Sequence, residues 1–258
     1  MAWLIAGIIL NINVVGQNVN VFGDELKNPG FIGIQAGISF PAGNYISDDP
    51  TVSGFALPGP GISAEGAWYF SDYFGLGFRM DYNRHFVAAE KMKEAYLSGL
   101  EENAELDINF DGIYTIATAM TGIYATMPLN RWLLLNGKFL YGPFWVKIPQ
   151  YTLHYQRAFT FYDQTLEDNY TETNYASSDW QFSYLVGLGL RMNMGNTWSF
   201  NIMLDYSESY QEIEFDYDGE GVIYDELGNP NYASGKQTST FNQNFRYMLL
   251  QGGFSFYF

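Results

Sequence analysis

Few residues in this chain could act in acid–base or nucleophilic chemistry. The 258-residue sequence has two histidines, His85 and His154, and no cysteine, which excludes a thiolate nucleophile and a thiolate metal site. Neither histidine has the neighbours at the spacing that predicts a nucleophile–base pair. We therefore predict that both histidines are polar rim residues, that the protein is not an enzyme, and that it uses no cofactor.

One acidic segment resembles part of a metal-binding loop. Asp216, Asp218 and Glu220 are followed by Gly221, as in the first half of a calcium loop, but the acid needed at the twelfth position is replaced by Leu227. We predict no dedicated metal site and keep these three acids as a weak candidate. Loose binding of divalent cations and a solvated, self-repelling segment both stay open.

Charged and amide side chains recur within otherwise apolar segments at a period of two residues. This is the period of a β-strand, whose successive side chains point to opposite faces. We predict that the polar face lines an interior, because a basic group facing lipid at the bilayer midplane costs roughly 2–4 kcal/mol. The predicted interior polar network comprises Gln35, Glu65, Arg79, Asp81, Lys138, Gln181, Arg191, Asp205 and Gln251.

Eight segments carry this period and would position those side chains. They lie at about 30–40, 61–70, 74–86, 112–126, 132–146, 179–192, 197–215 and 239–258. The apolar face of each segment is predicted to face lipid. In the segment 112–126 this face consists of Tyr114, Ile116, Met120 and Tyr124.

The connections between these segments alternate between short and long. The short ones are 71–73, 127–131 and 193–196, and the long ones are about 41–60, 87–111, 147–178 and 216–238. This asymmetry is typical of bacterial outer-membrane barrels. We predict an all-β fold: an eight-stranded antiparallel transmembrane β-barrel with short periplasmic turns and long extracellular loops, closed by pairing of its last and first strands. The spacing of apolar residues within 88–100 indicates either a short amphipathic helix or a mobile loop with nascent helix.

Aromatic residues flank every short connection. Such a ring is expected where a barrel meets the membrane–water interface. The predicted aromatic girdle comprises Trp68, Phe70, Tyr73, Phe74, Trp132, Trp198, Tyr257 and Phe258. If the first turn lies at 71–73, then Glu65 stands opposite Arg79 on the polar face, and we predict an ion pair between them inside the barrel.

The N-terminal region differs from the rest. Residues 2–15 resemble the apolar core of a secretory signal, so we predict a signal peptide at 1–16, a periplasmic segment at 17–29 and the barrel domain at 30–258. The net charge of −16 argues against binding to nucleic acid, which requires a basic surface.

With its eight alternating strands, short and long connections and terminal Phe258, the chain resembles the small outer-membrane barrels of Gram-negative bacteria, the OmpX, OmpW and OmpA β-domain type of porin-family barrel. The resemblance covers about 30–258. It implies insertion by the barrel-assembly machinery, which recognises the terminal strand in that family. Family functions are heterogeneous: structural, adhesive, or passage of small solutes.

An eight-stranded barrel has an interior that side chains can fill. We therefore expect a structural or surface-interaction protein of the bacterial outer membrane whose lumen is largely plugged by polar side chains. The alternatives are a narrow channel for small solutes and, further off, a barrel enzyme that modifies lipid. The expected partners are outer-membrane lipid and lipopolysaccharide, and the expected state is a monomer.

Overall fold

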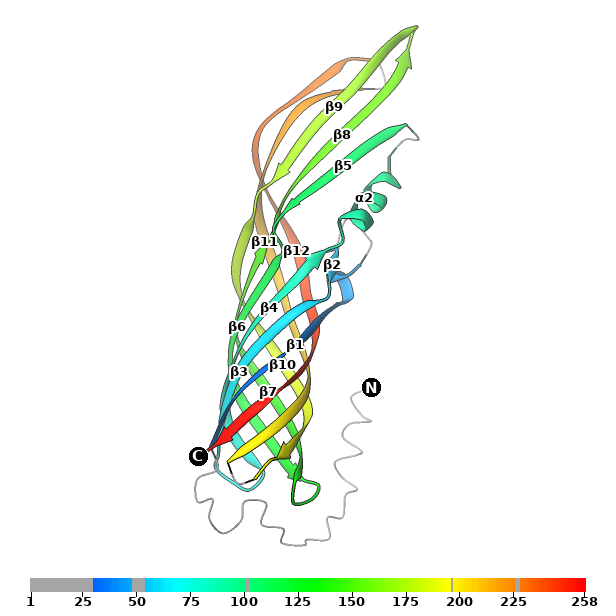
Figure 1. Ribbon diagram of the computed structural model, residues 1–258. Helices are drawn as coiled ribbons and strands as arrows, with labels where there is room; N and C mark the ends of the chain where they lie inside the picture. The colour runs from blue at the N-terminus through cyan, green and yellow to red at the C-terminus, as the bar shows by residue number, and fades with distance from the viewer. Residues whose placement is uncertain (1–29, 48–53, 101–102, 196, 226–227) are drawn as a thin grey trace, which may run out of the picture.

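The computed structural model describes residues 30–47, 54–100, 103–195, 197–225 and 228–258, and most of them lie in β-strands (Figure 1). The predicted signal peptide and periplasmic segment therefore lie outside the described residues. The barrel wall consists of β1 (Gly30–Ala42), β3 (Gly59–Tyr69), β4 (Phe74–Val87), β6 (Tyr114–Pro128), β7 (Leu133–Ile148), β10 (Ser177–Asn193), β11 (Trp198–Tyr224) and β12 (Pro230–Tyr257). The long connections contain η1 (Gly43–Tyr45), β2 (Ala56–Leu57), α2 (Ala89–Leu97), β5 (Ala104–Asp111), β8 (Gln150–Phe161) and β9 (Gln164–Asn174).

The eight wall strands form a closed antiparallel barrel, as predicted. Each wall strand pairs with the next wall strand in the sequence. The last one, β12, pairs with the first, β1, with Phe31 opposite Tyr257. Closure satisfies the backbone groups that an open edge would leave unpaired in lipid. None of the described helices is long and apolar enough to cross a membrane.

Side chains alternate between the outside and the inside of the wall. In β1 the outward residues Ile32, Ile34 and Ile38 are exposed, while Gln35 and Ser39 at alternate positions are buried. The same alternation gives the part of the barrel near the short turns an apolar outer belt, and gives the barrel interior a polar centre. The charges are thereby removed from the lipid-facing surface.

The prediction for β6 was wrong about which face points outward. Tyr114, Ile116, Met120 and Tyr124 are buried inside the barrel, and the outward positions carry mostly small residues and Ile123. Both faces of this strand lack charge, so its hydrophobicity does not identify the lipid-facing side. The interior accepts the large apolar residues because apolar layers lie above and below its polar centre.

The long connections differ from the predicted loops, because much of their length continues the wall as strands (Figure 1). Beyond Glu208, β11 leaves β10 and pairs with β9, and the sheet continues in the order β12, β11, β9, β8, β5. We call this five-stranded extension the protruding sheet. Strands form here because the backbone N–H and C=O groups of these long hairpins find hydrogen-bond partners in the neighbouring strands.

The helical alternative for 88–100 is confirmed as α2, which packs against β5 at the base of the protruding sheet. Met92 of α2 forms a small apolar cluster with Phe55, Leu106 and Ile108. This cluster is separate from the two apolar clusters inside the barrel. The protruding sheet therefore has its own core.

Candidate functional site

The centre of the barrel holds a network of buried charges around Arg79. Its Nη1 atom lies 3.2 Å from Oε2 of Glu65, and the two residues face each other across β3 and β4, as predicted. Arg79 also contacts Asp81 at 2.7 Å and Asp205 at 3.0 Å. Its side chain is fully buried, so water does not replace these partners.

Lys138 is the second cation of this network. Its Nζ atom lies 2.9 Å from Glu65 and 3.2 Å from Asp205, so each acid is shared with Arg79. Asp205 is held by charge at these distances, without hydrogen-bond geometry. A Cβ atom at Gly187 would lie 2.1 Å from Oδ1 of Asp205 and 2.5 Å from Cε of Lys138. Glycine at this position therefore leaves room for the ion pair.

Neutral side chains complete the network. Gln35 donates to Glu65 at 2.7 Å, and Gln251 accepts from Arg79 at 2.5 Å. Three further donors had not been predicted: Ser63 donates to Gln251, Thr118 to Asp81, and Tyr124 to Glu65. Thr118 and Tyr124 were not predicted because they lie on the face of β6 that had been assigned to lipid.

Two predicted members lie apart from this centre. Arg191 is buried toward the short turns, where its guanidinium lies 3.9 Å from the centre of the Phe31 ring and its Nε donates to Asn201. Gln181 is half-buried in register with Phe144, toward the long connections. Within the described chain it has no hydrogen bond to the central network. The structure thus brings together seven of the nine predicted residues, namely Gln35, Glu65, Arg79, Asp81, Lys138, Asp205 and Gln251.

An apolar layer fills the barrel on the side of the long connections. It includes Tyr45 from η1, Phe144, Ile213, Phe245 and Tyr247, all buried. The ring of Tyr45 contacts that of Phe245 at 5.0 Å between centroids. With this ring in place, the mouth of the barrel is filled above the charged network.

The prediction that His85 lies at the rim was wrong, because His85 is fully buried below this apolar layer. Asp81 and His85 are separated by four residues, and this even spacing puts both on the inward face of β4. The ring nitrogens of His85 lie 3.0 Å from the Tyr45 hydroxyl and 2.7 Å from the Ser39 hydroxyl. The histidine therefore anchors η1 to the inside of the barrel.

A second apolar layer lies toward the short turns. It includes Phe31, Tyr69, Leu140, Leu185 and Tyr257. Tyr257 had been predicted in the aromatic girdle, but its side chain is only 6% exposed and points into the barrel, where its hydroxyl contacts Arg191. Tyr257, the last residue of β12, has the inward parity, which explains the error.

The family comparison agrees with this architecture. A model of the outer membrane protein beta-barrel domain matches residues 9–248. The chain belongs to this family. It is accordingly an outer-membrane protein of bacteria.

Several solved outer-membrane barrels are similar to this family member. Ail, the attachment invasion locus protein of Yersinia pestis, is 13% identical, with 89% of this chain and 97% of that chain covered and a TM-score of 0.34. Neisserial surface protein A is 9% identical, with 89% and 97% covered and a TM-score of 0.40. OprG of Pseudomonas aeruginosa is 13% identical, with 89% and 96% covered and a TM-score of 0.37. The comparison with curated proteins gave no significant match.

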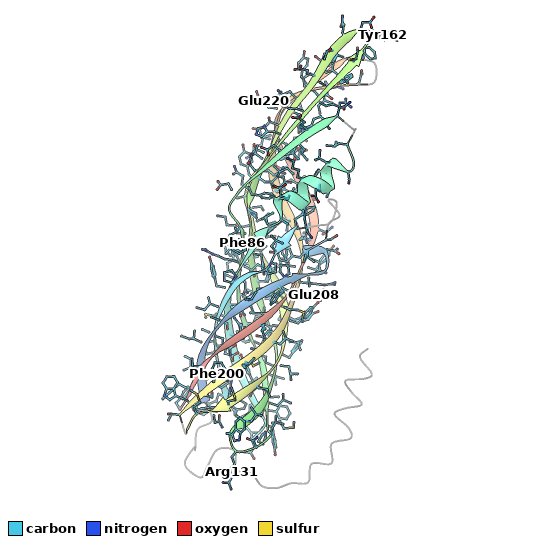
Figure 2. All side chains as sticks on the ribbon, turned by 45° about the vertical axis from the view of Figure 1, so that its right-hand side comes forward. Phe86, Arg131, Tyr162, Phe200, Glu208 and Glu220 are labelled. Carbon is cyan, nitrogen blue, oxygen red and sulfur yellow. The ribbon has the colours of Figure 1, made fainter. Side chains whose placement is uncertain are left out.

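Seven of the eight residues predicted to form the aromatic girdle are exposed around the short turns of this outer-membrane barrel, and Tyr257 is the exception. The seven are Trp68, Phe70, Tyr73, Phe74, Trp132, Trp198 and Phe258. Above the apolar belt, the first charged outward residue of β11 is Glu208 (Figure 2). The first on β12 is Arg246, whose Nη2 lies 2.6 Å from Oε1 of Glu208. Burial acts to raise the pKa of Glu208, but hydrogen bonds from Tyr184, Tyr206 and Arg246 outweigh it and lower the pKa to about 2.

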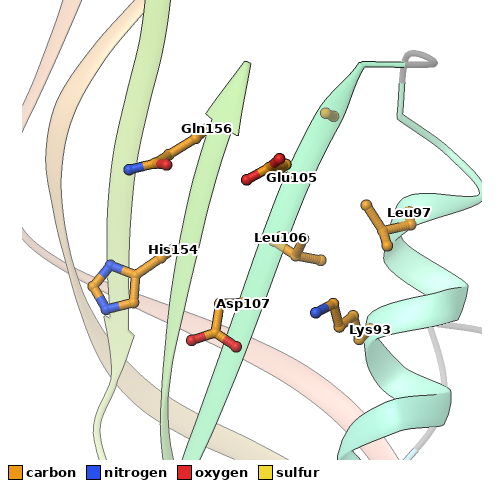
Figure 3. Close-up of a pocket in the computed structure, with 8 residues that line it drawn as sticks. Lys93, Leu97, Glu105, Leu106, Asp107, His154 and Gln156 are labelled. Atoms are coloured by element: carbon orange, nitrogen blue, oxygen red, sulfur yellow. The ribbon is translucent and has the colours of Figure 1, made fainter. Parts of the chain in front are cut away.

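The protruding sheet has an open groove of about 540 Å³ beside α2 (Figure 3). Lys93 of α2, Asp107 of β5 and His154 of β8 line it, and His154 is exposed and bonded to the Thr171 hydroxyl at 2.9 Å. The groove is polar and open to solvent, so it presents a surface rather than an enclosed site.

The acidic candidate segment does not form a calcium loop. Asp216, Asp218 and Glu220 all lie within strand β11, and Asp216 is paired with Lys236 at 2.9 Å. In the part of the chain that the structure describes, no group of three or more histidine and acidic side chains is arranged to hold a metal ion. These residues instead form an acidic stripe along one face of the protruding sheet.

Proposed function

We propose that this protein is a closed outer-membrane barrel that acts through its extracellular protruding sheet, in a structural or surface-interaction role. The observation that carries the proposal is the filling of the lumen. Arg79 and Lys138 bridge Glu65 and Asp205 across the barrel, with an apolar layer on each side. An ion entering such a lumen would have to displace buried, mutually neutralising charges.

The position of the protruding sheet supports a role at the cell surface. β11 and β12 run 27 and 28 residues, far beyond the length of about 9–11 residues that spans a membrane. The additional length pairs with β9 and displays acidic side chains, and the protruding sheet that it joins has its own apolar cluster under α2. A chain that needed only a membrane anchor would not require this extension.

The proposal also covers the molecules that the barrel contacts. The apolar belt would contact outer-membrane lipid and lipopolysaccharide, the protein would act as a monomer, and the barrel-assembly machinery would insert it through its terminal strand. Enzymatic activity is not proposed. Ser39 and His85 are hydrogen-bonded, but both are buried beneath Tyr45, so a substrate has no access to them.

Conductance across a planar lipid bilayer tests the closed lumen. Wild-type protein should insert without producing current steps above the background of the bilayer, in salt solutions from low to molar concentration. Tyr45→Ala, which removes the ring from the mouth, should also stay closed because the central charges remain. Stable current steps from the wild-type protein, altered in size by Tyr45→Ala, would instead favour the narrow channel.

A further inference from the structure

Two rows of outward side chains cross the barrel wall just above its apolar belt. Strand register aligns Tyr82, Ala117, Trp145 and Trp180 in the lower row, on β4, β6, β7 and β10. One step further along the same face, it aligns Arg84, Thr115, Lys147 and Ser178. An aromatic row is thus followed directly by a row of cations and hydroxyls, which is the order of chemistry found where acyl chains meet headgroups.

Among the described residues, the two cations of the upper row have no acidic partner. Arg84 donates through Nε to the Tyr82 hydroxyl at 3.2 Å, and its guanidinium lies 5.6 Å from the centre of that ring. Neither Arg84 nor Lys147 forms an ion pair with any carboxylate in the described segments. By contrast, Arg246, the first charged outward residue of β12 above the belt, is paired with Glu208.

Acidic residues outnumber basic ones in this protein. The chain has 28 acidic and 12 basic residues, and five of the described cations are paired with a carboxylate. Arg84 lies on β4 and Lys147 on β7. The strand between them, β6, places Thr115 at the same level. Two strand spacings separate their Cα atoms by about 10 Å, and both side chains are long enough to reach one anion above Thr115.

We propose that Arg84, Thr115 and Lys147 form a binding site for the phosphate group of an outer-leaflet membrane lipid, with Tyr82 and Trp145 against its hydrophobic part. A phosphate accepts hydrogen bonds from a guanidinium, an ammonium and a hydroxyl at once. The nitrogen atoms Nη1 and Nη2 of Arg84 supply donors that Tyr82 does not use. Charge complementarity selects an anionic headgroup, and the neighbouring belt selects a lipid over a free ion.

This inference rests on the proposed contact between the wall and outer-leaflet lipid, and it does not depend on the closed lumen. Conductance tests the lumen and lipid binding tests the wall, so the two can fail separately. Substitutions at these outward positions leave the buried network and the apolar layers untouched. The folded barrel should therefore survive them, which its heat-dependent migration on gels would verify.

The test measures equilibrium binding of lipid A to the full chain in neutral detergent micelles. Native mass spectrometry detects the bound lipid. Arg84→Gln or Lys147→Gln should weaken binding about fivefold each, and the double variant about 25-fold. The charge-preserving double variant Arg84→Lys/Lys147→Arg should retain most of the affinity. Arg131→Gln, at the exposed turn on the opposite side of the membrane, should bind like wild type (Figure 2).

Dephosphorylated lipid A provides the matched ligand. Its binding should be weak, and equal for wild type and the Arg84→Gln/Lys147→Gln variant. The proposal would be overturned by lipid A binding that is unchanged in the double variant, by equal loss in Arg131→Gln, or by equal affinity for the phosphorylated and dephosphorylated lipids. Displacement of lipid A by an equal concentration of inorganic phosphate would overturn the assignment to a lipid.

Discussion

Two cross-strand ion pairs of this protein have the same chemistry and opposite surroundings. Arg79 and Glu65, in the barrel, have side chains that are 0% and 1% exposed, whereas Lys236 and Asp216, in the protruding sheet, are 60% and 42% exposed. Their closest nitrogen–oxygen distances are similar, 3.2 Å and 2.9 Å. Distance alone therefore does not distinguish them, and the difference lies in what surrounds each pair.

This difference shows how the two regions are stabilised. Inside the barrel, charges have lost water and depend on one another, so each partner is necessary to the others. On the protruding sheet, water competes for each charge and the pair contributes little. The barrel centre should be rigid and intolerant of single substitutions, while the acidic surface should tolerate change and remain available for contacts.

Removal of Arg79 should have the largest effect. Arg79→Ala leaves Lys138 as the one described cation in ion-pair contact with Glu65 and Asp205, and Asp81 without any such contact in the described residues. The substitution should lower the free energy of unfolding by about 3–5 kcal/mol. Glu65→Ala should cost less, because Arg79 keeps Asp81 and Asp205. Urea unfolding of the refolded barrel in detergent or lipid vesicles measures both.

The double variant Arg79→Ala/Glu65→Ala shows whether the residues act as one unit. Its loss should be smaller than the sum of the two single losses by about 1 kcal/mol or more, because each single variant strands the other charge. Arg131→Ala, which removes an exposed cation, is the control and should leave stability unchanged. Additive losses would mean that the pair is not coupled and that the comparison with the surface pair does not hold.

The charged centre of the barrel was predicted correctly because charged residues show which alternate positions of a strand face inward. Glu65 and Arg79 were placed opposite each other from the position of the first turn alone, and the observed register agrees. Tyr124 and Thr118 were missed because β6 has no charged residue to identify its inward face. Tyr257 was misplaced because composition near the terminus was given more weight than parity.

The upper half of the molecule was harder to predict. The segments 147–178 and 216–238 are rich in polar and acidic residues, so they were assigned to loops, although they pair into long hairpins. Their apolar residues, such as Leu106 and Leu153, become informative only when α2 covers them. The burial of His85 depends on Tyr45, which approaches from a connection distant in sequence. Such long-range contacts are not visible in local periodicity.

The core of the protruding sheet should give an intermediate, local effect. Leu106→Ala removes a side chain that is 4% exposed and packed in the cluster with Met92, and should cost about 2 kcal/mol. The loss should appear as faster proteolysis of the segments 87–111 and 147–178, with the barrel still folded on gels. Leu100→Ala, at an exposed leucine, is the matched control. Simultaneous loss of the barrel would show that the two regions unfold together.

The surroundings of Glu208 are intermediate between those of the buried and the exposed ion pair, because it lies just above the apolar belt. Its lowered pKa, about 2 in the folded protein, means that the folded state favours the carboxylate. This contribution is present above the unfolded value of 4.5 and is lost as pH falls from about 4.5 towards 2. Because Arg246 is 40% exposed, the effect should be about 1 kcal/mol or less. The difference in unfolding free energy between wild type and Glu208→Gln should shrink across this window, and a constant difference would contradict the assignment.

The exposed pair should give the smallest effect, and it is the most direct test of the comparison. Lys236→Ala or Asp216→Ala should leave the unfolding midpoint within experimental error, because both side chains are largely hydrated before and after the change. Thr238, which also donates to Asp216, remains to hold the carboxylate in Lys236→Ala. Any small difference should disappear at high salt, which screens exposed charges but not the buried network. The same salt series on Arg79→Ala should leave its loss almost unchanged. If the surface pair proved as costly to break as the buried one, burial would not be the property that separates the two regions.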